Sequence, residues 1–300
     1  VAARPSMGKT AFALNIAQFG GGGRNAAVLI FSLEMSAEQL VQRMLGSQAQ
    51  VDIQAMNTGT MGKSDWDELQ NAAGILTRRS IFIDDSSMLT TMDFRARCRR
   101  FKARHENLGL IVVDYLQLMS FGGRSLDNRQ QEVAEISRML KGVARELDCP
   151  VLALSQLSRE TEKRPDKKPM LSDLRDSGAI EQDADMVCFI HRPEYYKILE
   201  DERGNSLAGI AEIIVAKHRN GATGDVRLRF KSEFAKFINL SEDQAVREYA
   251  SSMNQEDVFA PAPVTAPAVV TPVAEATGLA SWAWLLIAVP AVSAALLLLA

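Results

Sequence analysis

The stretch that decides the fold lies almost at the start of this 300-residue chain, and it reads Ala3-Arg4-Pro5-Ser6-Met7-Gly8-Lys9-Thr10. Its spacing matches a P-loop, except that Ala3 stands where the motif begins with glycine. Backbone N–H groups of such a loop, together with the N-terminus of the helix that follows, surround an anionic phosphate. The stretch therefore predicts a phosphate-binding loop; the alternative is a chance Gly-Lys-Thr at the start of a helix.

Two side chains of this loop indicate a nucleotide that carries a metal ion. Lys9 is expected to reach the β- and γ-phosphates. The hydroxyl of Thr10 suits Mg²⁺, which keeps most of its octahedral shell as water and phosphate oxygen. The predicted ligands are a nucleotide with β- and γ-phosphates and Mg²⁺, with residues 3–10 forming the nucleotide site.

Residues 1–245 alternate apolar, β-rich runs with amphipathic stretches, which predicts an α/β fold with a mainly parallel sheet flanked by helices. The near-continuous Val, Ile and Leu runs indicate strands that are buried on both faces. The expected strands are 26–33, 80–84, 110–114, 150–155 and 185–191, followed by a hairpin of 209–217 and 225–230. The expected helices are 9–18, 37–46, 65–76, 92–104 and 129–147, and Ser36 and Gln39 have the spacing of a capping box.

Three of these apolar runs end in a polar side chain. Asp114 follows Leu110-Ile111-Val112-Val113, the Walker B arrangement, where it could hold Mg²⁺ or cap a helix. Glu34 could deprotonate the water that attacks a γ-phosphate, or serve as a partner of the dipole of the next helix. Gln156 could sense the γ-phosphate or merely end its strand. The residues alone leave these alternatives open.

Composition excludes some classes of protein but does not identify a partner. The chain has 34 basic and 37 acidic residues, a net charge of −3, so it lacks the strong positive charge typical of many nucleic-acid binders, although a local patch could still serve. Its three cysteines lie far apart without metal-ligand spacing, which argues against a disulfide scaffold and a zinc module. We expect them to be small buried hydrophobic residues.

Six motifs follow one another between residue 1 and about residue 240: A-R-P-S-M-G-K-T, F-S-L-E-M-S, V-D-Y-L-Q-L-M, L-S-Q-L-S-R, S-D-L-R-D-S-G-A-I-E-Q-D-A-D and K-H-R-N-G. In this order they resemble the C-terminal motor domain of the DnaB family of bacterial replicative DNA helicases. Alanine at position 3 is usual in that family. The resemblance implies a RecA-like domain in a ring-shaped homohexamer, with ATP bound between neighbouring subunits.

The resemblance also implies roles for single residues. Lys9 and Thr10 correspond to the phosphate and Mg²⁺ ligands, Glu34 to the catalytic base, Asp114 to the Walker B acid, and Gln156 to the γ-phosphate sensor. Lys217 and Arg219 resemble the pair that reaches into the next subunit's site; a solvated strand end is the alternative. Arg175, Asp176 and Gly178 match the channel loop that grips single-stranded DNA, with Asp176 where glutamate is frequent.

The function expected from the resemblance is ATP-driven, 5′-to-3′ translocation on single-stranded DNA and unwinding of the duplex during replication. The family also implies primase and a helicase loader as partners, and a cytoplasmic location. A RecA-like ATP switch or a recombination-type ATPase that does not unwind DNA is the alternative.

The two ends of the chain lie outside this resemblance. The motif begins directly after Val1, so we expect a fragment that lacks its true N-terminus, including the family's N-terminal domain and linker helix. Residues 246–278 are predicted to be a linker, acidic and then rich in Ala, Pro and Val. Residues 279–300 are uncharged and long enough to span a bilayer, so a membrane anchor, a non-native gene end and a packed apolar helix are the three interpretations.

Overall fold

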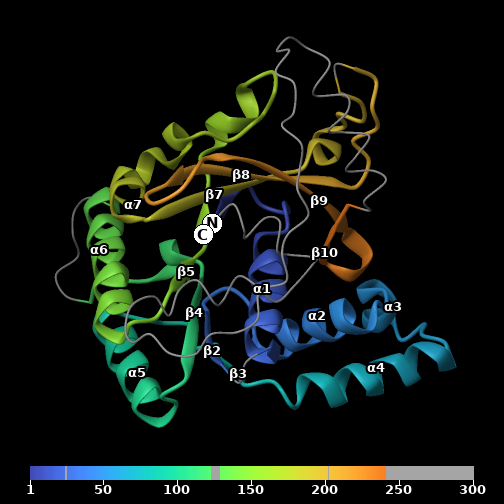
Figure 1. The fold of residues 1–300 in the computed structure, drawn as a ribbon, viewed down its shortest axis with the longest axis horizontal. Coiled ribbons are helices and arrows are strands. Elements are labelled where there is room, and N and C mark those ends of the chain that lie inside the picture. Colours follow the sequence, from blue (N-terminus) through green and yellow to red (C-terminus); the bar gives the residue numbers. More distant parts are fainter. Residues whose placement is uncertain (24–25, 123–128, 202, 241–300) are drawn as a thin grey trace, which may run out of the picture.

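The centre of the fold is a twisted sheet with helices on both of its faces (Figure 1). The computed structural model describes residues 1–23, 26–122, 129–201 and 203–240, with the backbone alone at 22–23 and 175–177. The strands are β1 (Ala2–Ala3), β2 (Ala27–Ser32), β3 (Ile81–Asp84), β4 (Leu108–Asp114), β5 (Val151–Ala153), β6 (Ser155–Gln156), β7 (Met186–His191), β8 (Ile210–His218), β9 (Gly224–Lys231) and β10 (Lys236–Asn239). The helices are α1 (Lys9–Gly23), α2 (Ala37–Ala49), α3 (Ile53–Thr58), α4 (Lys63–Leu76), α5 (Thr91–Arg104), α6 (Arg129–Leu147) and α7 (Gly178–Asp183).

Two groups of strands join into one sheet through Leu154. Their orders are β3-β2-β4-β5 and β10-β9-β8-β7-β1-β6. Leu154 alone separates β5 from β6; its N–H donates to Val113 O at 2.9 Å, and the N–H of Ser155 donates to Val1 O at 2.9 Å. The strands from β3 across to β7 are parallel, whereas β8, β9 and β10 add antiparallel pairs. The carboxyl ends of β1, β2, β4 and β6 therefore meet at one edge, where open α/β sheets bind their ligands.

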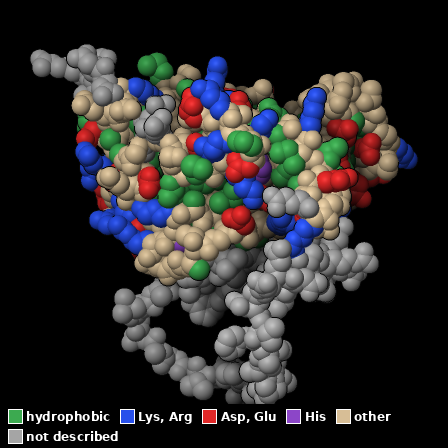
Figure 2. Space-filling view, turned by 90° about the horizontal axis from the view of Figure 1, so that it is seen from above, with side chains coloured by type: hydrophobic (Ala, Val, Ile, Leu, Met, Phe, Trp, Pro, Cys, Tyr) green, Lys and Arg blue, Asp and Glu red, His purple; other side chains and the backbone are tan. Residues whose placement is uncertain are grey.

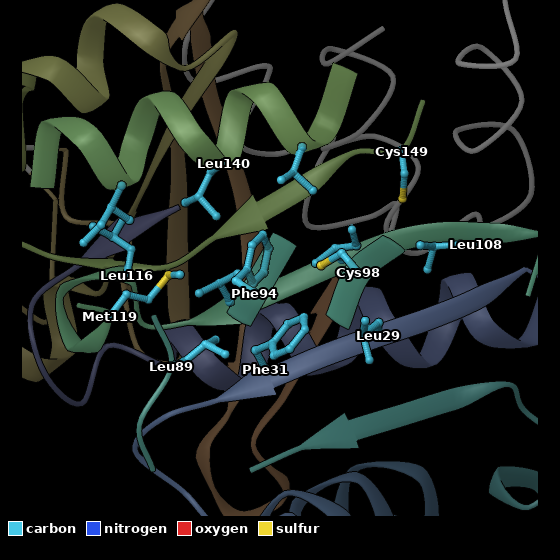
Figure 3. Packing of buried hydrophobic residues seen from close by; sticks show 14 of the residues in the cluster. Leu29, Phe31, Leu89, Phe94, Cys98, Leu108, Leu116, Met119, Leu140 and Cys149 are labelled. Atoms are coloured by element: carbon cyan, nitrogen blue, oxygen red, sulfur yellow. The ribbon is translucent and has the colours of Figure 1, made fainter. Parts of the chain in front are cut away.

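Alternate side chains of β2 enter two different hydrophobic clusters. Leu29 and Phe31 belong to the cluster that packs under α5 and α6, shown in Figure 3. Val28 and Ile30 belong to the cluster that packs under α1 and α2. All four side chains are buried, because helices cover both faces of the parallel strands. This confirms the burial that the apolar runs predict.

The predicted elements are confirmed with shifts of a few residues at their ends. The hairpin forms from β8 and β9, and Ser36 caps α2 through a capping box in which its hydroxyl accepts from the Gln39 N–H and its own N–H donates to Gln39 Oε1 at 3.2 Å. The sequence analysis did not predict β1, β10, α3 or α7. Each is six residues or shorter, which is too short for a periodic pattern to reveal it.

The prediction for the cysteines is confirmed, whereas the predictions for the end of the chain are not tested. Cys98, Cys149 and Cys188 are free thiols and buried, as expected, and burial raises the pKa of Cys149 to about 12. The predicted linker and apolar tail, 246–300, lie outside the described residues, so the boundaries assigned to them stay predictions. Among the residues that the structure does describe, no helix is both long and apolar enough to cross a bilayer.

The first prediction concerns the core under α5. Phe94 is fully buried and its ring lies 4.9 Å from that of Phe31, so Phe94→Ala is expected to lower the free energy of unfolding by about 3–5 kcal/mol. Met92 lies on the same helix but is 75% exposed, so Met92→Ala is expected to cost less than about 0.5 kcal/mol. Urea unfolding of both variants checks this; equal losses would contradict the assignment of the core.

Candidate active site

The loop between β1 and α1 turns sharply toward the sheet edge. Ser6 and Gly8 have left-handed backbone conformations, with φ of 63° and 93°. A Cβ atom at position 8 would lie 3.1 Å from Phe237 and 3.2 Å from Phe230, so only glycine fits both the conformation and the space. The N–H of Phe12 then donates to Gly8 O at 2.8 Å and starts the helical hydrogen bonds of α1. The loop is thus shaped for close approach of a phosphate to the backbone.

Thr10 and Asp114 meet at the carboxyl edge of the sheet. The Thr10 hydroxyl donates to Asp114 Oδ2 at 2.6 Å, and Asp114 is only 2% exposed. The other carboxylate oxygen, Oδ1, is buried and finds no donor in the part of the chain that the structure describes. Burial raises the pKa of Asp114, although the Thr10 hydrogen bond and the charge of Lys9 oppose this. A hard divalent cation would satisfy this oxygen, so the residues fit Mg²⁺.

Lys9 is half-buried beside this carboxylate. Its Nζ atom lies 4.8 Å from the centre of the Tyr115 ring, a cation–π contact. Burial lowers the pKa of Lys9, while the negative charges of Asp114 and Glu34 act in the opposite direction. A phosphate group in the loop would add a direct, charge-assisted hydrogen-bond partner for this ammonium group.

Glu34 and Gln156 come to the same edge from two other strands. Ser32, the last residue of β2, pairs with Asp114, and the N–H of Leu33 donates to Asp114 O at 2.7 Å, so Glu34 follows directly beside the carboxylate. Gln156 pairs with Ala3 at the start of the loop. Both side chains are exposed. The structure thus brings together Lys9, Thr10, Glu34, Asp114 and Gln156, which are separated by up to 147 positions in the sequence.

Gln117 is a residue that the sequence analysis missed. Its Nε2 donates to Ser155 Oγ at 2.7 Å, and its Oε1 accepts from the N–H of Gln156 at 3.3 Å. Gln117 therefore fixes the end of β6, from which the Gln156 side chain projects. It lies inside the V-D-Y-L-Q-L-M motif, but only the contact between β6 and the turn after β4 reveals its role.

Two arginines support the loop from outside. Arg192, directly after β7, donates to Ser6 O at 3.2 Å and stacks 4.2 Å from the centre of the Phe230 ring. The side chain of Arg4 donates to Leu157 O and pairs with Glu162, both at 2.9 Å. Arg4 therefore contributes its backbone to the predicted nucleotide site, while its guanidinium group binds the segment after β6.

Lys217 and Arg219 lie at the opposite edge of the sheet. His218, between them, pairs with Met186 at the start of β7, whereas β1 pairs with Phe189 and continues from there into the loop. The six residues of β7 span about 17 Å at ~3.3 Å per residue, so neither side chain belongs to the subunit's own phosphate site.

The predicted DNA-contacting residues lie close to this second edge. Residues Leu171–Ser177 form a 3₁₀ turn, and Gly178 begins α7. The side chains of Arg175 and Asp176 lie outside the described part of the structure. The face of the molecule seen in Figure 2 carries basic and acidic side chains in scattered groups among apolar and other atoms.

Comparison with known families decides the ancestry of this domain. Residues 1–239 match the family of the DnaB-like helicase C terminal domain. The chain belongs to this family. The family and the α/β fold are those that the sequence resemblance predicts.

Named relatives and solved structures agree with the DnaB-like assignment. The replicative DNA helicase DnaB of Geobacillus stearothermophilus is 55% identical over 240 residues, which cover 80% of this chain and 52% of the relative. The replicative DNA helicase DnaC of Bacillus subtilis (strain 168) gives the same identity and coverage. The chain thus spans about half the length of these relatives.

Two solved structures have the same fold. One is an isolated ATPase domain, which superposes with a TM-score of 0.74 at 39% identity, over 80% of this chain and 83% of that one. A DnaB-like replicative helicase, described together with its interactions with primase, superposes with a TM-score of 0.73 at 38% identity, over 80% of this chain and 56% of that one.

The second prediction tests the shape of the loop. Gly8→Ala places a methyl group against two phenylalanine rings at a φ of 93°, so it is expected to weaken nucleotide binding at least about tenfold. Gly74→Ala is the matched control, because a Cβ atom at Gly74 meets nothing within 4 Å. Titration with a fluorescent ATP analogue measures both variants; equal affinities would mean that the loop does not bind the nucleotide.

Proposed function

We propose that this domain is the ATP-hydrolysing motor of a replicative DNA helicase that moves 5′ to 3′ on single-stranded DNA. The observation that supports it best is the shared sheet edge, where Lys9, the Thr10–Asp114 pair and Glu34 lie around the predicted phosphate-binding loop. Membership of the DnaB-like family supports the same function. The polarity is an expectation from the family.

The residues present fit ATP with Mg²⁺. Thr10 and the free oxygen of Asp114 would hold the cation, which when bound neutralises phosphate charge. Glu34 removes a proton from water, and the water oxygen attacks the γ-phosphorus as the bond to the β–γ bridging oxygen breaks. Lys9 stabilises the negative charge on the phosphates. Gln156, whose backbone N–H donates to Gln117, would contact the γ-phosphate through its side-chain amide.

The active assembly is proposed to be a homohexameric ring. Lys217 and Arg219 lie at the sheet edge opposite to their own phosphate loop, so they suit a site on the neighbouring subunit. A cation supplied in this way stabilises charge in the transition state of phosphoryl transfer and contributes a rate factor of about 10³ to 10⁵. Hydrolysis in one subunit then depends on the position of the next.

Single-stranded DNA is the proposed polymer substrate, gripped through its backbone by Arg175, Asp176 and Gly178. Phosphate contacts carry no sequence information, which suits a motor that must pass over every sequence. Primase and a helicase loader are proposed partners, because the family implies them. The proposed location is the cytoplasm, where a bacterial replicative helicase would meet chromosomal DNA.

The direct test of this function is ATP hydrolysis with and without single-stranded DNA, together with unwinding of a forked duplex. The proposal predicts hydrolysis that DNA stimulates, and strand separation that requires ATP. Hydrolysis without unwinding, at a rate indifferent to DNA, would instead identify a RecA-like switch.

The third prediction separates two roles at the phosphate site. Lys9→Ala is expected to abolish hydrolysis in a folded protein, because the ammonium group stabilises phosphate charge and does not belong to the core. Glu34→Gln is expected to retain nucleotide binding within about threefold and to lose at least about a hundredfold in kcat, since only proton transfer is removed. Binding titrations beside steady-state rates check both. Collapse of nucleotide affinity in Glu34→Gln would make Glu34 structural.

The fourth prediction tests action between subunits by complementation. Lys9→Ala leaves Arg219 intact, and Arg219→Ala leaves the phosphate loop intact, so Lys9→Ala alone is expected to be inactive and Arg219→Ala alone to keep only a small residual rate. Rings assembled from an equal mixture regain active sites wherever an intact loop faces an intact Arg219, about a quarter of the interfaces for random assembly. Recovery toward a quarter of the wild-type rate supports action in trans. A mixture no faster than the sum of its parts would show that Arg219 acts in its own subunit or not at all.

A further inference from the structure

Helix α7 connects the candidate DNA loop, which contains Arg175, Asp176 and Gly178, to Lys217. It begins at Gly178, the last residue of the candidate DNA loop, and ends at Asp183. At its far end, Lys217 Nζ donates to the carbonyl oxygens of Glu181 at 2.5 Å and Gln182 at 3.3 Å. The last carbonyls of a helix lack intrahelical partners and favour a cation, so this contact is a stable attachment. A helix of six residues is only ~9 Å long, so movement of the DNA loop would reach Lys217 directly.

Asp185, two residues beyond α7, makes a second attachment. Its backbone oxygen accepts from the N–H of Arg219 at 2.8 Å, and its Oδ1 accepts from Arg219 Nη1 at 3.2 Å. The same Oδ1 accepts from Lys141 Nζ on α6. Asp185 therefore holds the backbone and the guanidinium group of Arg219 at once, and α6 holds Asp185.

These ion pairs orient the Arg219 side chain more than they stabilise the fold. The side chains of Asp185 and Arg219 are 61% and 53% exposed, and exposed ion pairs add at most about 1 kcal/mol to folding. Burial opposes ionisation of Asp185, but the hydrogen bond from Lys141 and the charges of Lys141, Arg219 and Arg145 lower its pKa overall. The carboxylate stays charged, and Arg219 can exchange it for a phosphate oxygen at little cost while the backbone bond keeps the strand end in place.

We propose, resting on the motor function above, that Asp185 is a positioning residue. Together with α7, it connects Lys217 and Arg219 to the DNA loop. DNA bound by one subunit thereby sets the positions of the two cations that act on the ATP of the next subunit. Lys217 is attached to the end of α7, and Arg219 is attached to Asp185, which lies directly before β7. The DNA loop, α7 and the strand end of β8 thus move as one unit.

The test is Asp185→Asn, which removes the charge but keeps the backbone carbonyl. With saturating single-stranded DNA, the full chain carrying Asp185→Asn is expected to lose about three- to tenfold in kcat for ATP, while KM for ATP and Kd for DNA change less than twofold. Asp185→Glu keeps the charge and is expected to retain at least half of the wild-type kcat. Glu135→Gln is the matched control, because it removes one carboxylate charge from an exposed ion pair with Arg138 on α6 that involves neither Asp185 nor Arg219; its kcat is expected to stay within twofold.

A double variant distinguishes positioning from general damage. If Asp185 acts through Arg219, Asp185→Asn combined with Arg219→Ala is no slower than Arg219→Ala alone, because the group being positioned is already absent. Losses that multiply, or an equal loss in Glu135→Gln, would overturn the proposal. If circular dichroism shows that Asp185→Asn is unfolded, Asp185→Glu carries the test, and a kcat below half of the wild-type value in that variant overturns the proposal.

The wild-type chain in the same assay separates this inference from the proposed function. Hydrolysis by the wild type that DNA does not stimulate would contradict the motor function, and the inference would fall with it. Stimulation in the wild type with an unchanged Asp185→Asn would overturn the inference alone.

Discussion

The hydrogen bond between Thr10 and Asp114 is the contact on which the rest of the site depends. It joins the first turn of α1 to the end of β4. The strand that leads into α1 is β1, and β1 does not pair with β4 because β5 and β6 lie between them. The 2.6 Å bond can form only if all these strands end at one edge in register. Once it forms, Lys9, Glu34 and Gln156 are placed around the same loop. It also leaves one buried oxygen of Asp114 unsatisfied, in a place that suits a cation.

The sheet separates the phosphate loop from Lys217 and Arg219, the two residues proposed to act on a neighbouring subunit. The phosphate loop lies at the carboxyl edge of the parallel strands, whereas Lys217 and Arg219 lie at the other edge because β8 runs antiparallel to β7. Under the proposed function, a single subunit would carry half of one site and half of another. That division explains in physical terms why a motor of this kind would work as a ring, and why α7 and Asp185, at the second edge, are suited to relay the state of the DNA.

Local patterns predicted much of this fold. The apolar runs predicted the long strands, and the spacing of glycine, lysine and threonine predicted the phosphate loop. Each of these patterns lies within a few consecutive residues, so it can be seen in the sequence alone. Other parts depend on contacts between distant positions. Gln117 acquires a role only when the turn after β4 meets β6, and Arg192 only when β7 ends beside Ser6. The opposite placement of Arg219 follows from strand register, and its attachment to Asp185 requires both β7 and β8. No periodicity in the sequence encodes these contacts.

The central claim is that the free oxygen of Asp114 and the hydroxyl of Thr10 form the cation side of a nucleotide site. The most direct measurement is the affinity of a fluorescent ATP analogue with Mg²⁺ and with EDTA, compared between the wild type and Asp114→Asn. Asparagine can still accept the Thr10 hydrogen bond but lacks the charge. The account predicts that Mg²⁺ raises the affinity of the wild type at least about tenfold and that of Asp114→Asn less than about twofold. An equal effect of Mg²⁺ on both proteins would contradict it.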